Sequence, residues 1–525
     1  MTNDSRARRK GIGDSISAGI TQDIRDLHQF GYQQKLRRTI GAYTSFALGF
    51  SMISITTTIF TLFANPFQMI GGVGIWLWIP VTLGILVITA VYGHLSARLP
   101  VTGYTYQWSS RIVNKEYGWF SGWTALLSFF AGTASIAVAM ATVFSPEIWE
   151  VPTQADIAGF AAVAILVAVL VNIISIRAAT WFNNVGASVE LVGTLGLTVI
   201  AAIGLFFFSD KQGPKVLFQV GSTVGGPTNA TTIGLAMLLP VYTLLGWEGS
   251  AGLAEETLDP RKTAPTAMFR AVIISGVAAF FVFAVFAMAI PGNIPATINQ
   301  PGNPLIAVFQ MHFGEGLTLL LKAVALVAIF SALLANVTVA TRMCFSLARD
   351  NMLPGSKALS RVNAKTRTPI NSTLLVCSFA LLVNLLSAGI INRVVAIVAV
   401  MFYGTYLLTL VATLVGSKTG NIPDAPLRYF NLGRWLRPFA WLGILWSVIV
   451  IGYMTVPKVN QLAGEYTVFF EIVGALWFFL YLRKKFRTGE AGPPLGGHVG
   501  IDEEELQIAR ESSSGPSHLP ALLDS

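Results

Sequence analysis

Gly246-Trp247-Glu248-Gly249 interrupts an apolar stretch, residues 231–254, that is long enough to cross a lipid bilayer. The hydrocarbon core holds no water, so a break in a membrane helix survives only where it lines a cavity or is buried in protein. A glutamate at that depth is costly, and intramembrane acids mark binding sites or ion pathways. The stretch therefore predicts a membrane protein with a solute pathway.

The rest of the chain has the composition of a polytopic membrane protein. Of its 525 residues, 53% are hydrophobic and 12% are charged, and the mean hydropathy is +0.63. Because a bilayer needs roughly 20 apolar residues per helix, we expect about twelve spans. The predicted spans are 42–63, 73–93, 119–145, 156–176, 185–208, 231–254, 271–290, 316–341, 370–388, 393–416, 438–456 and 465–482.

The basic residues follow this topology. A net charge of +9 suggests nucleic acid in a soluble protein, but here most of the 35 Lys and Arg precede the first span, follow the last or occupy alternate connections. The positive-inside rule then places both termini in the cytoplasm and gives no reason to expect a nucleic-acid partner. We expect a cytoplasmic segment at 1–38, a membrane core at 39–487 and a disordered cytoplasmic tail at 488–525, in a protein of the plasma membrane.

The first span carries a second unusual feature, a run of hydroxyl side chains at 54–58 in the middle of an apolar segment. Serine and threonine in membrane helices commonly bond back to the preceding turn. Interrupted helices at matching positions of two halves instead indicate an inverted repeat with a substrate site at the midplane. We therefore predict an all-α protein in which spans 1–5 and 6–10 are inverted five-helix repeats with broken helices 1 and 6.

Signatures of other protein classes are missing from the sequence. There is no phosphate-binding Gly-Lys-Ser or Gly-Lys-Thr loop and no His-Glu-x-x-His zinc helix. None of the five histidines lies deep within a predicted span. We expect no enzyme activity, no cofactor, no metal site and no obligatory protein partner, and the lipid bilayer is the expected surrounding.

Three segments resemble one transporter superfamily, the amino acid–polyamine–organocation permeases. The break at Gly246-Trp247-Glu248 with AEETLDPRKTAP at 254–265 resembles the sixth helix of that superfamily and its following loop. LSARLPVTGYTY at 95–106 resembles the end of its second helix. DLHQFGYQQKLRR at 26–38 is similar to the segment before the first helix in the amino acid/choline branch, which includes the gamma-aminobutyrate permeases.

The resemblance implies substrate held between broken helices 1 and 6, and transport by alternating access. It gives Glu248 a role in gating and proton handling, and it makes Tyr242 an aromatic lid over the substrate. A cation–π contact of Tyr242 with an ammonium group and ordinary packing are both open. The predicted substrate-binding residues are Ser54, Thr56, Thr57, Thr58, Tyr242, Gly246, Trp247 and Glu248.

Two departures from the family pattern bear on mechanism. Many members have Gly-Ser-Gly in the first helix to receive a substrate carboxylate, whereas this chain has Thr56-Thr57-Thr58, whose side chains hinder a close backbone approach. In the fifth span Glu190 stands where proton-coupled relatives carry a lysine. Glu190 and Glu248 are the predicted coupling residues, with a proton as the expected ion; sodium binding or a static hydrogen bond at Glu190 is the alternative.

The sequence thus predicts a secondary transporter that imports amino acids or related amines such as gamma-aminobutyrate, coupled to protons. The alternatives within this class are a choline, ethanolamine or polyamine transporter and an amino acid exchanger. A nutrient sensor that binds solute without transport, and signals through its tails, is the alternative from another class. A channel is disfavoured because a pair of broken helices suits an occluded site better than a continuous pore.

Overall fold

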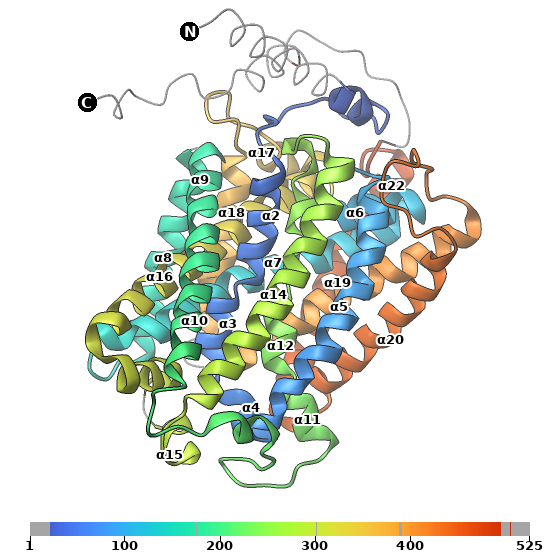
Figure 1. Cartoon of the computed structure of the whole chain (residues 1–525). Coiled ribbons are helices and arrows are strands. Elements are labelled where there is room, and N and C mark those ends of the chain that lie inside the picture. The colour runs from blue at the N-terminus through green and yellow to red at the C-terminus, as the bar shows by residue number, and fades with distance from the viewer. Residues whose placement is uncertain (1–21, 175, 301, 388–390, 495–504, 506–525) are drawn as a thin grey trace, which may run out of the picture.

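Long apolar helices run the height of the molecule (Figure 1). The computed structural model describes residues 22–174, 176–300, 302–387, 391–494 and 505. Within these residues ten helices are long and apolar enough to cross a membrane, and the shorter apolar helices Ala230–Thr243 and Ile370–Leu385 complete the expected twelve spans. Every named element in this part of the chain is helical. The predicted all-α polytopic fold is confirmed.

The first span is broken in its middle. Helix α2 (Ala42–Ile53) ends at Ser54, which has φ 37° and ψ 86°, and α3 (Ile55–Leu62) begins directly after it. The Ser54 side chain accepts a hydrogen bond from the Thr57 amide and so caps α3. The first repeat then continues through α4 (Ala64–Met69), α5 (Trp78–Ser96), α6 (Tyr104–Ile112), α7 (Lys115–Phe144), α8 (Gln154–Ile174), α9 (Ile176–Val189), the π-helical turn η3 (Glu190–Thr194) and α10 (Leu195–Gly204).

The sixth span is divided into three short helices. It consists of α11 (Ala230–Ala236), α12 (Leu238–Thr243) and the short α13 (Gly249–Gly252), with irregular backbone at 244–248. The second repeat continues with α14 (Pro260–Met288), α16 (Pro304–Arg349), α18 (Ile370–Ser387) and α19 (Ile391–Thr419). The breaks in spans 1 and 6 agree with the expected inverted repeat.

The eighth span is much longer than predicted. The expected 316–341 segment lies inside α16, a helix of 46 residues that kinks at Gly314, where φ is 70°. The charged residues Arg342 and Arg349 belong to its last turns. Their charge places them outside the predicted span, yet the Arg342 side chain is buried and that of Arg349 is only 11% exposed.

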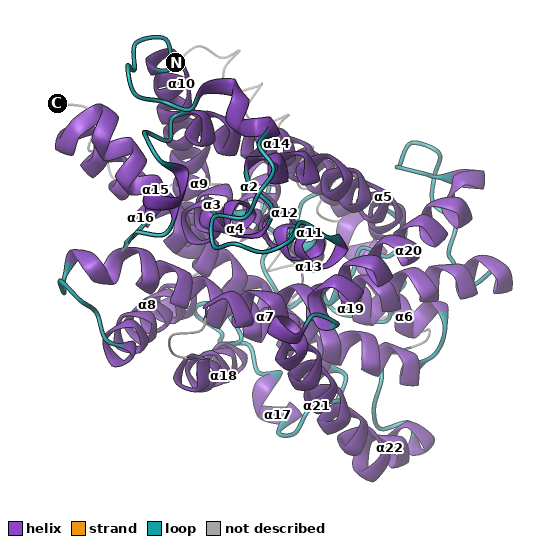
Figure 2. Ribbon diagram, turned by 90° about the horizontal axis from the view of Figure 1, so that it is seen from below, coloured by secondary structure: helices purple, strands orange, loops and turns teal. Residues whose placement is uncertain are grey.

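Helices differ in how far they face the surroundings. Seen from below, α3, α12 and α13 gather near the middle of the bundle, and α8, α18 and α22 (Arg483–Thr488) lie at its margin (Figure 2). In the apolar stretch of the span built on α7, 94% of the residues are buried. In that of the span built on α20 (Leu436–Thr455), 28% are buried. α20 and α21 (Gln461–Trp477) follow the two repeats and expose apolar side chains, as lipid-facing helices do.

Both ends of the described chain lie at the same end of the bundle, which we name the terminal face (Figure 1). It comprises residues 22–40 and 489–494 with the helix ends beneath them. Leu27, Tyr32 and Leu36 of the N-terminal segment are buried there. In the predicted tail, 488–494 and Glu505 are described, and Ala491 and Glu505 are buried. The remainder of the predicted tail, and residues 1–21 of the predicted N-terminal segment, lie outside the described residues.

Candidate functional site

The break in the first span is built around Ser54. Its positive φ of 37° is uncommon for a residue with a side chain, and it turns the chain so that α3 starts afresh. The first backbone N–H groups of a helix have no partner within that helix. At α3 one of these donors, the Thr56 amide, meets a carboxylate from another span.

That carboxylate belongs to Glu190. Its Oε1 accepts hydrogen bonds from the Thr56 backbone N at 3.0 Å and from Ser54 Oγ at 3.3 Å. The Thr56 and Thr194 hydroxyl oxygens lie 2.9 Å apart and join the same two spans. Glu190 opens the π-helical turn η3, a geometry that recurs at functional sites because it redirects side chains within a helix. The positive end of α3 thus faces a buried acid.

The break in the sixth span packs directly against the first span. Gly246 has φ 88°, and a Cβ atom there would lie 2.9 Å from the Met52 Cβ. A Cβ at Gly249 would lie 2.4 Å from the Met52 sulfur, and one at Gly49 would lie 2.7 Å from Ser250 Oγ. Glycine at these positions allows the two broken helices to approach so closely.

Glu248 is fully buried at this second break. Its Oε2 accepts a hydrogen bond from the Tyr406 hydroxyl at 3.0 Å, and its Oε1 has no partner among the described residues. Tyr92 packs edge-on against both Trp247 and Tyr406, with ring centroids 5.1 and 5.7 Å apart. Glu248 and Trp247 are therefore directed toward an aromatic cluster from spans 2 and 10.

A cavity of about 30 Å³ lies between the two breaks. A volume of this size holds a water molecule but no amino acid. The structure is therefore closed around the candidate site, and entry of a solute requires the helices to move. The polar side chains that line the cavity are Ser54, Thr57, Thr58, Tyr242 and Asn336.

The cavity includes only part of the predicted site. Among the predicted substrate-binding residues, Ser54, Thr57, Thr58, Tyr242 and Gly246 line it, whereas Thr56, Trp247 and Glu248 do not. The predicted coupling residue Glu190 also lies outside the lining and contacts the back of the first break. The predicted residues therefore lie at both breaks. Some of them line the cavity, and the two acids, Glu190 and Glu248, are buried beside it.

Several contributors from other spans are not among the predicted site residues. Asn336 in α16 donates to Phe129 O at 2.9 Å and to Thr133 Oγ1 at 2.7 Å, which fixes its side chain at the cavity wall. Ser135 and Tyr242 share a hydrogen bond of 2.7 Å. Tyr406 had no local signal. Asn336 offered one, because an amide in the middle of an apolar helix is unusual.

The acids at the two breaks share one electrostatic property. Neither Glu190 nor Glu248 forms an ion pair with a basic residue in the part of the chain that the structure describes. Their hydrogen-bond donors are hydroxyl and amide groups. A buried carboxyl group with no permanent cation nearby is suited to receive a proton or a cationic solute.

A cluster of ion pairs closes the terminal face below the N-terminal segment. The Arg342 guanidinium contacts both carboxylate oxygens of Glu256, at 2.7 and 3.2 Å. Arg349 Nη1 contacts both oxygens of Glu255, at 3.0 and 2.9 Å. These four residues, which we call the gate cluster, join the end of span 6 to the end of span 8. The sequence supplied the charges, but it did not show which pairs form.

The N-terminal segment is bonded to this cluster. The backbone amides of Thr39 and Ile40 both donate to Glu256 O at 2.9 Å. The Tyr32 hydroxyl donates to Asp350 Oδ2 at 2.7 Å, and the Arg349 guanidinium lies 3.7 Å from the Tyr32 ring centroid. Burial, and then the nearby Asp350 carboxylate, raise the pKa of Tyr32, so its hydroxyl remains a donor at neutral pH. The segment is therefore fixed to the terminal face by hydrogen bonds and a cation–π contact.

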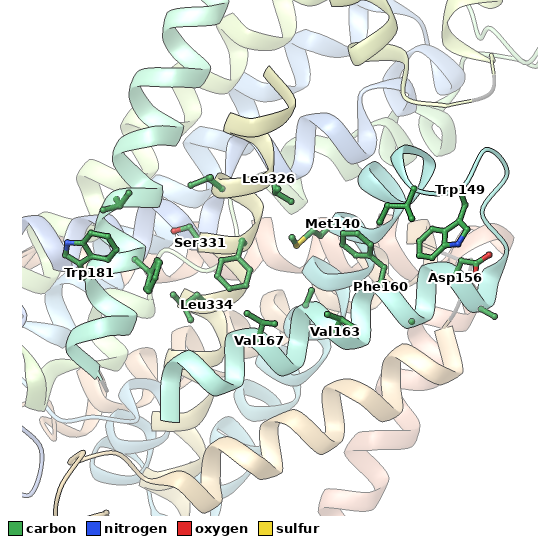
Figure 3. A pocket seen from close by; sticks show the side chains of 18 residues that line it. Met140, Trp149, Asp156, Phe160, Val163, Val167, Trp181, Leu326, Ser331 and Leu334 are labelled. Carbon is green, nitrogen blue, oxygen red and sulfur yellow. The ribbon is translucent and has the colours of Figure 1, made fainter. Parts of the chain in front are cut away.

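A large groove lies away from both breaks. It has a volume of about 930 Å³, and its lining is almost entirely apolar. Trp181 lies at one end and Trp149 and Asp156 at the other, with Leu326 and Leu334 between them (Figure 3). It opens between α8, α9 and α16 on the side that faces lipid. Its size does not make it the solute site, because it lacks polar groups to orient a small solute.

Comparison with known proteins identifies the family of this chain. The family model for amino acid permeases matches residues 40–478, which cover both repeats and most of the two last spans. The match includes the first and sixth breaks, Glu190 and the gate cluster. The resemblance to the amino acid–polyamine–organocation superfamily is thereby confirmed.

Individual relatives are distant but extend over most of the chain. The amino-acid permease BAT1 of Arabidopsis thaliana is 24% identical and matches 84% of this chain and 89% of its own length. A BAT1 homolog from Oryza sativa subsp. japonica is 25% identical over 82% of this chain and 87% of its own. A putative polyamine transporter of Candida albicans is 21% identical over 98% of this chain and 96% of its own. The chain belongs to the amino acid permease family, and it is a multi-pass membrane permease rather than an enzyme.

Proposed function

We propose that this permease is a secondary active transporter that imports amine-bearing solutes across the plasma membrane, amino acids and gamma-aminobutyrate among them, together with protons. The observation that carries the proposal is the placement of Glu190 and Glu248. Each is buried beside one helix break, and neither has a basic partner among the described residues. A proton or a substrate ammonium group supplies the positive charge that each site lacks.

The contact between Glu190 and the Thr56 amide supports a specific role in coupling. A carboxylate is stabilised at the positive end of α3, and protonation weakens that interaction. Changing the charge of Glu190 therefore changes how firmly span 5 is held to the first break. In this mechanism the proton on Glu190 alters the helix 1 geometry during each transport cycle.

Alternating access then requires opening of the terminal face, which we propose is cytoplasmic. Basic residues concentrate at this face and in the chain ends, as the positive-inside rule expects. The proposed motion rocks spans 1, 2, 6 and 7 against the other spans. Glu255 and Glu256 move with span 6, so opening breaks their ion pairs with Arg349 and Arg342 on span 8.

Uptake into proteoliposomes tests the proposal. Labelled gamma-aminobutyrate is supplied with and without an inward proton gradient, while unlabelled alpha-amino acids, choline and putrescine compete. We expect the wild-type protein to accumulate solute when the gradient is present. The Glu471→Gln control should do the same. Glu471 is a suitable control because its carboxyl group accepts a hydrogen bond from Thr124 Oγ1 at 2.7 Å. It also lies far along the sequence from both helix breaks. Saturable uptake that ignores the gradient would reject proton coupling.

A polyamine or another cation without a carboxylate is the second candidate substrate. Glu190 already occupies the Thr56 amide, which leaves less of the first break for a substrate carboxylate. The distant relative whose printed name is putative polyamine transporter is consistent with this reading. Putrescine as the strongest competitor would favour the second candidate, and an alpha-amino acid or gamma-aminobutyrate would favour the first.

A further inference from the structure

A basic pocket lies at the terminal face, away from the helix breaks and the gate cluster. It has a volume of about 590 Å³ and is formed by the end of α5, the end of α19 and the chain that leads into α20. Its polar lining includes three arginines and one acid. The residues that matter below are His94, Arg98, Ser417, Asp424, Arg434 and Arg437.

Two of the three arginines, Arg98 and Arg437, are held in place by hydrogen bonds that do not neutralise them. Arg98 is only 5% exposed, and its Nη1 donates to His94 O at 2.9 Å and to Phe430 O at 3.1 Å. Arg437 Nε donates to Ser417 Oγ at 3.1 Å. In the described residues no carboxylate lies within ion-pair distance of Arg98, Arg434 or Arg437. Backbone and hydroxyl oxygens orient Arg98 and Arg437, and the positive charge of all three arginines remains available.

Other groups in the pocket do not cancel this charge. Asp424 lines it and attracts Arg98, but it is one carboxylate facing three guanidinium groups. The His94 Nδ1 accepts a hydrogen bond from the Leu432 amide at 3.2 Å, so this nitrogen carries no proton. Arg434 lies 5.7 Å from the Trp435 ring centroid. The pocket therefore presents a net positive surface, with donors of Arg98 and Arg437 held in place.

Exposed apolar side chains next to the basic pocket indicate where the bilayer lies, and so what kind of molecule the pocket can hold. α20 begins at Leu436 beside the pocket, and below it Trp441, Leu442 and Leu445 expose more than half of their surface. Trp435 is also 54% exposed, as an aromatic side chain at the membrane interface is expected to be. Helices rise about 1.5 Å per residue, so Arg437 lies roughly one turn above Trp441. A headgroup in the pocket would thus leave its acyl chains along α20.

We propose that this pocket binds the phosphate headgroup of an anionic phospholipid from the leaflet that surrounds the terminal face. Basic pockets between membrane helices recognise such headgroups, because guanidinium groups pair with phosphate oxygens in a fixed geometry. Arg434 and Arg437 bind the phosphate from the outer rim, and Arg98 contacts it from within. This inference concerns lipid binding and does not depend on the transported solute.

The test measures lipid retention by the purified full-length protein. The protein in detergent is titrated with dioleoyl phosphatidylglycerol, and bound lipid is counted by native mass spectrometry. Arg434→Ala/Arg437→Ala is expected to weaken binding by roughly 30-fold, since each basic residue near a lipid surface contributes roughly fivefold. The matched control is Arg428→Ala, because Arg428 belongs to the same connection, stacks on Tyr429 and is outside the pocket lining.

A second variant and two competitors make the result decisive. Asp424→Asn removes the one acid in the lining and is expected to strengthen binding, so the two pocket variants should move in opposite directions. Dioleoyl phosphatidylcholine and inorganic phosphate at the same concentration should displace little lipid. Equal loss in the Arg428→Ala control, unchanged binding in the double variant, or full displacement by inorganic phosphate would overturn the assignment to an anionic phospholipid.

Discussion

The two helix breaks and the gate cluster both contain buried glutamates, but the surroundings of those glutamates differ. Glu255 and Glu256 each contact a guanidinium group through both carboxylate oxygens. Glu190 and Glu248 contact only hydroxyl and amide donors. The paired acids stabilise one closed arrangement, whereas an acid without a basic partner is free to take up a proton or a cation. The comparison separates acids in ion pairs from the acids to which we assign binding and coupling.

Removing one member of the gate cluster should have the largest effect. Arg342→Met leaves Glu256 buried without its partner, so we expect the free energy of unfolding to fall by about 3–5 kcal/mol. The measurement is reversible unfolding in mixed micelles. Arg342 and Glu256 are 1% and 0% exposed, which makes hydration of the remaining carboxylate difficult.

The double variant Arg342→Met/Glu256→Met is the control for this prediction. Replacing both members of a buried pair by apolar side chains is often close to neutral. We therefore expect the double variant to recover most of the stability that Arg342→Met loses. If the single variant loses less than about 1 kcal/mol, the pair is no more than a solvated surface contact, and the contrast with the helix breaks fails.

Substitution of Ser54 should have an intermediate effect and sharpen the account of the first break. Ser54→Ala removes the cap of α3 and one donor to Glu190, and we expect a loss of about 1–2 kcal/mol in the free energy of unfolding. Ser54→Gly removes the same bonds but tolerates the positive φ, so it should lose about 1 kcal/mol less. Equal losses in the two variants would show that the left-handed backbone contributes nothing.

The smallest expected effect comes from Tyr406→Phe, which deletes the one side-chain donor to Glu248 that the described residues supply. Loss of this hydrogen bond should weaken solute binding by about 1 kcal/mol. The solute concentration for half-maximal uptake should then rise by roughly fivefold. Tyr403→Phe is the matched control, because its hydroxyl lies in the same helix and accepts from Trp446 Nε1 at 3.3 Å. Equal changes in uptake in the two variants would contradict a specific role for the Tyr406–Glu248 hydrogen bond, since the effect would then come from packing of α19.

The positions of both helix breaks were predictable because they follow from local chemistry. Glycines beside a glutamate at bilayer depth predict the sixth break, and the hydroxyl run predicts the first. The left-handed residue itself was not predictable, because Ser54 carries a side chain and nothing in the sequence marks it as the turning point. Likewise, the long α16 was cut short by the assumption that charged residues end a span.

The partners of the buried acids could not be read from the sequence, because they come from distant spans. Tyr406 reaches Glu248 across 158 positions, and Glu190 reaches the first break across 134. A periodic pattern indicates which face of a helix is apolar but not which helix packs on that face. The sequence therefore identified the candidate acids, and the structure was needed to show that Glu248 and Trp247 face an aromatic cluster rather than the cavity.

Proton movement during solute entry tests the central claim most directly. Proteoliposomes with a trapped pH-sensitive dye receive solute from outside, and internal acidification is compared between wild type, Glu190→Gln, Glu248→Gln and the control Glu471→Gln. The account predicts acidification in the wild type and in the control, and its loss in at least one of the two break variants while solute binding remains. Equal acidification in all four proteins would contradict the assignment of coupling to the buried acids at the helix breaks.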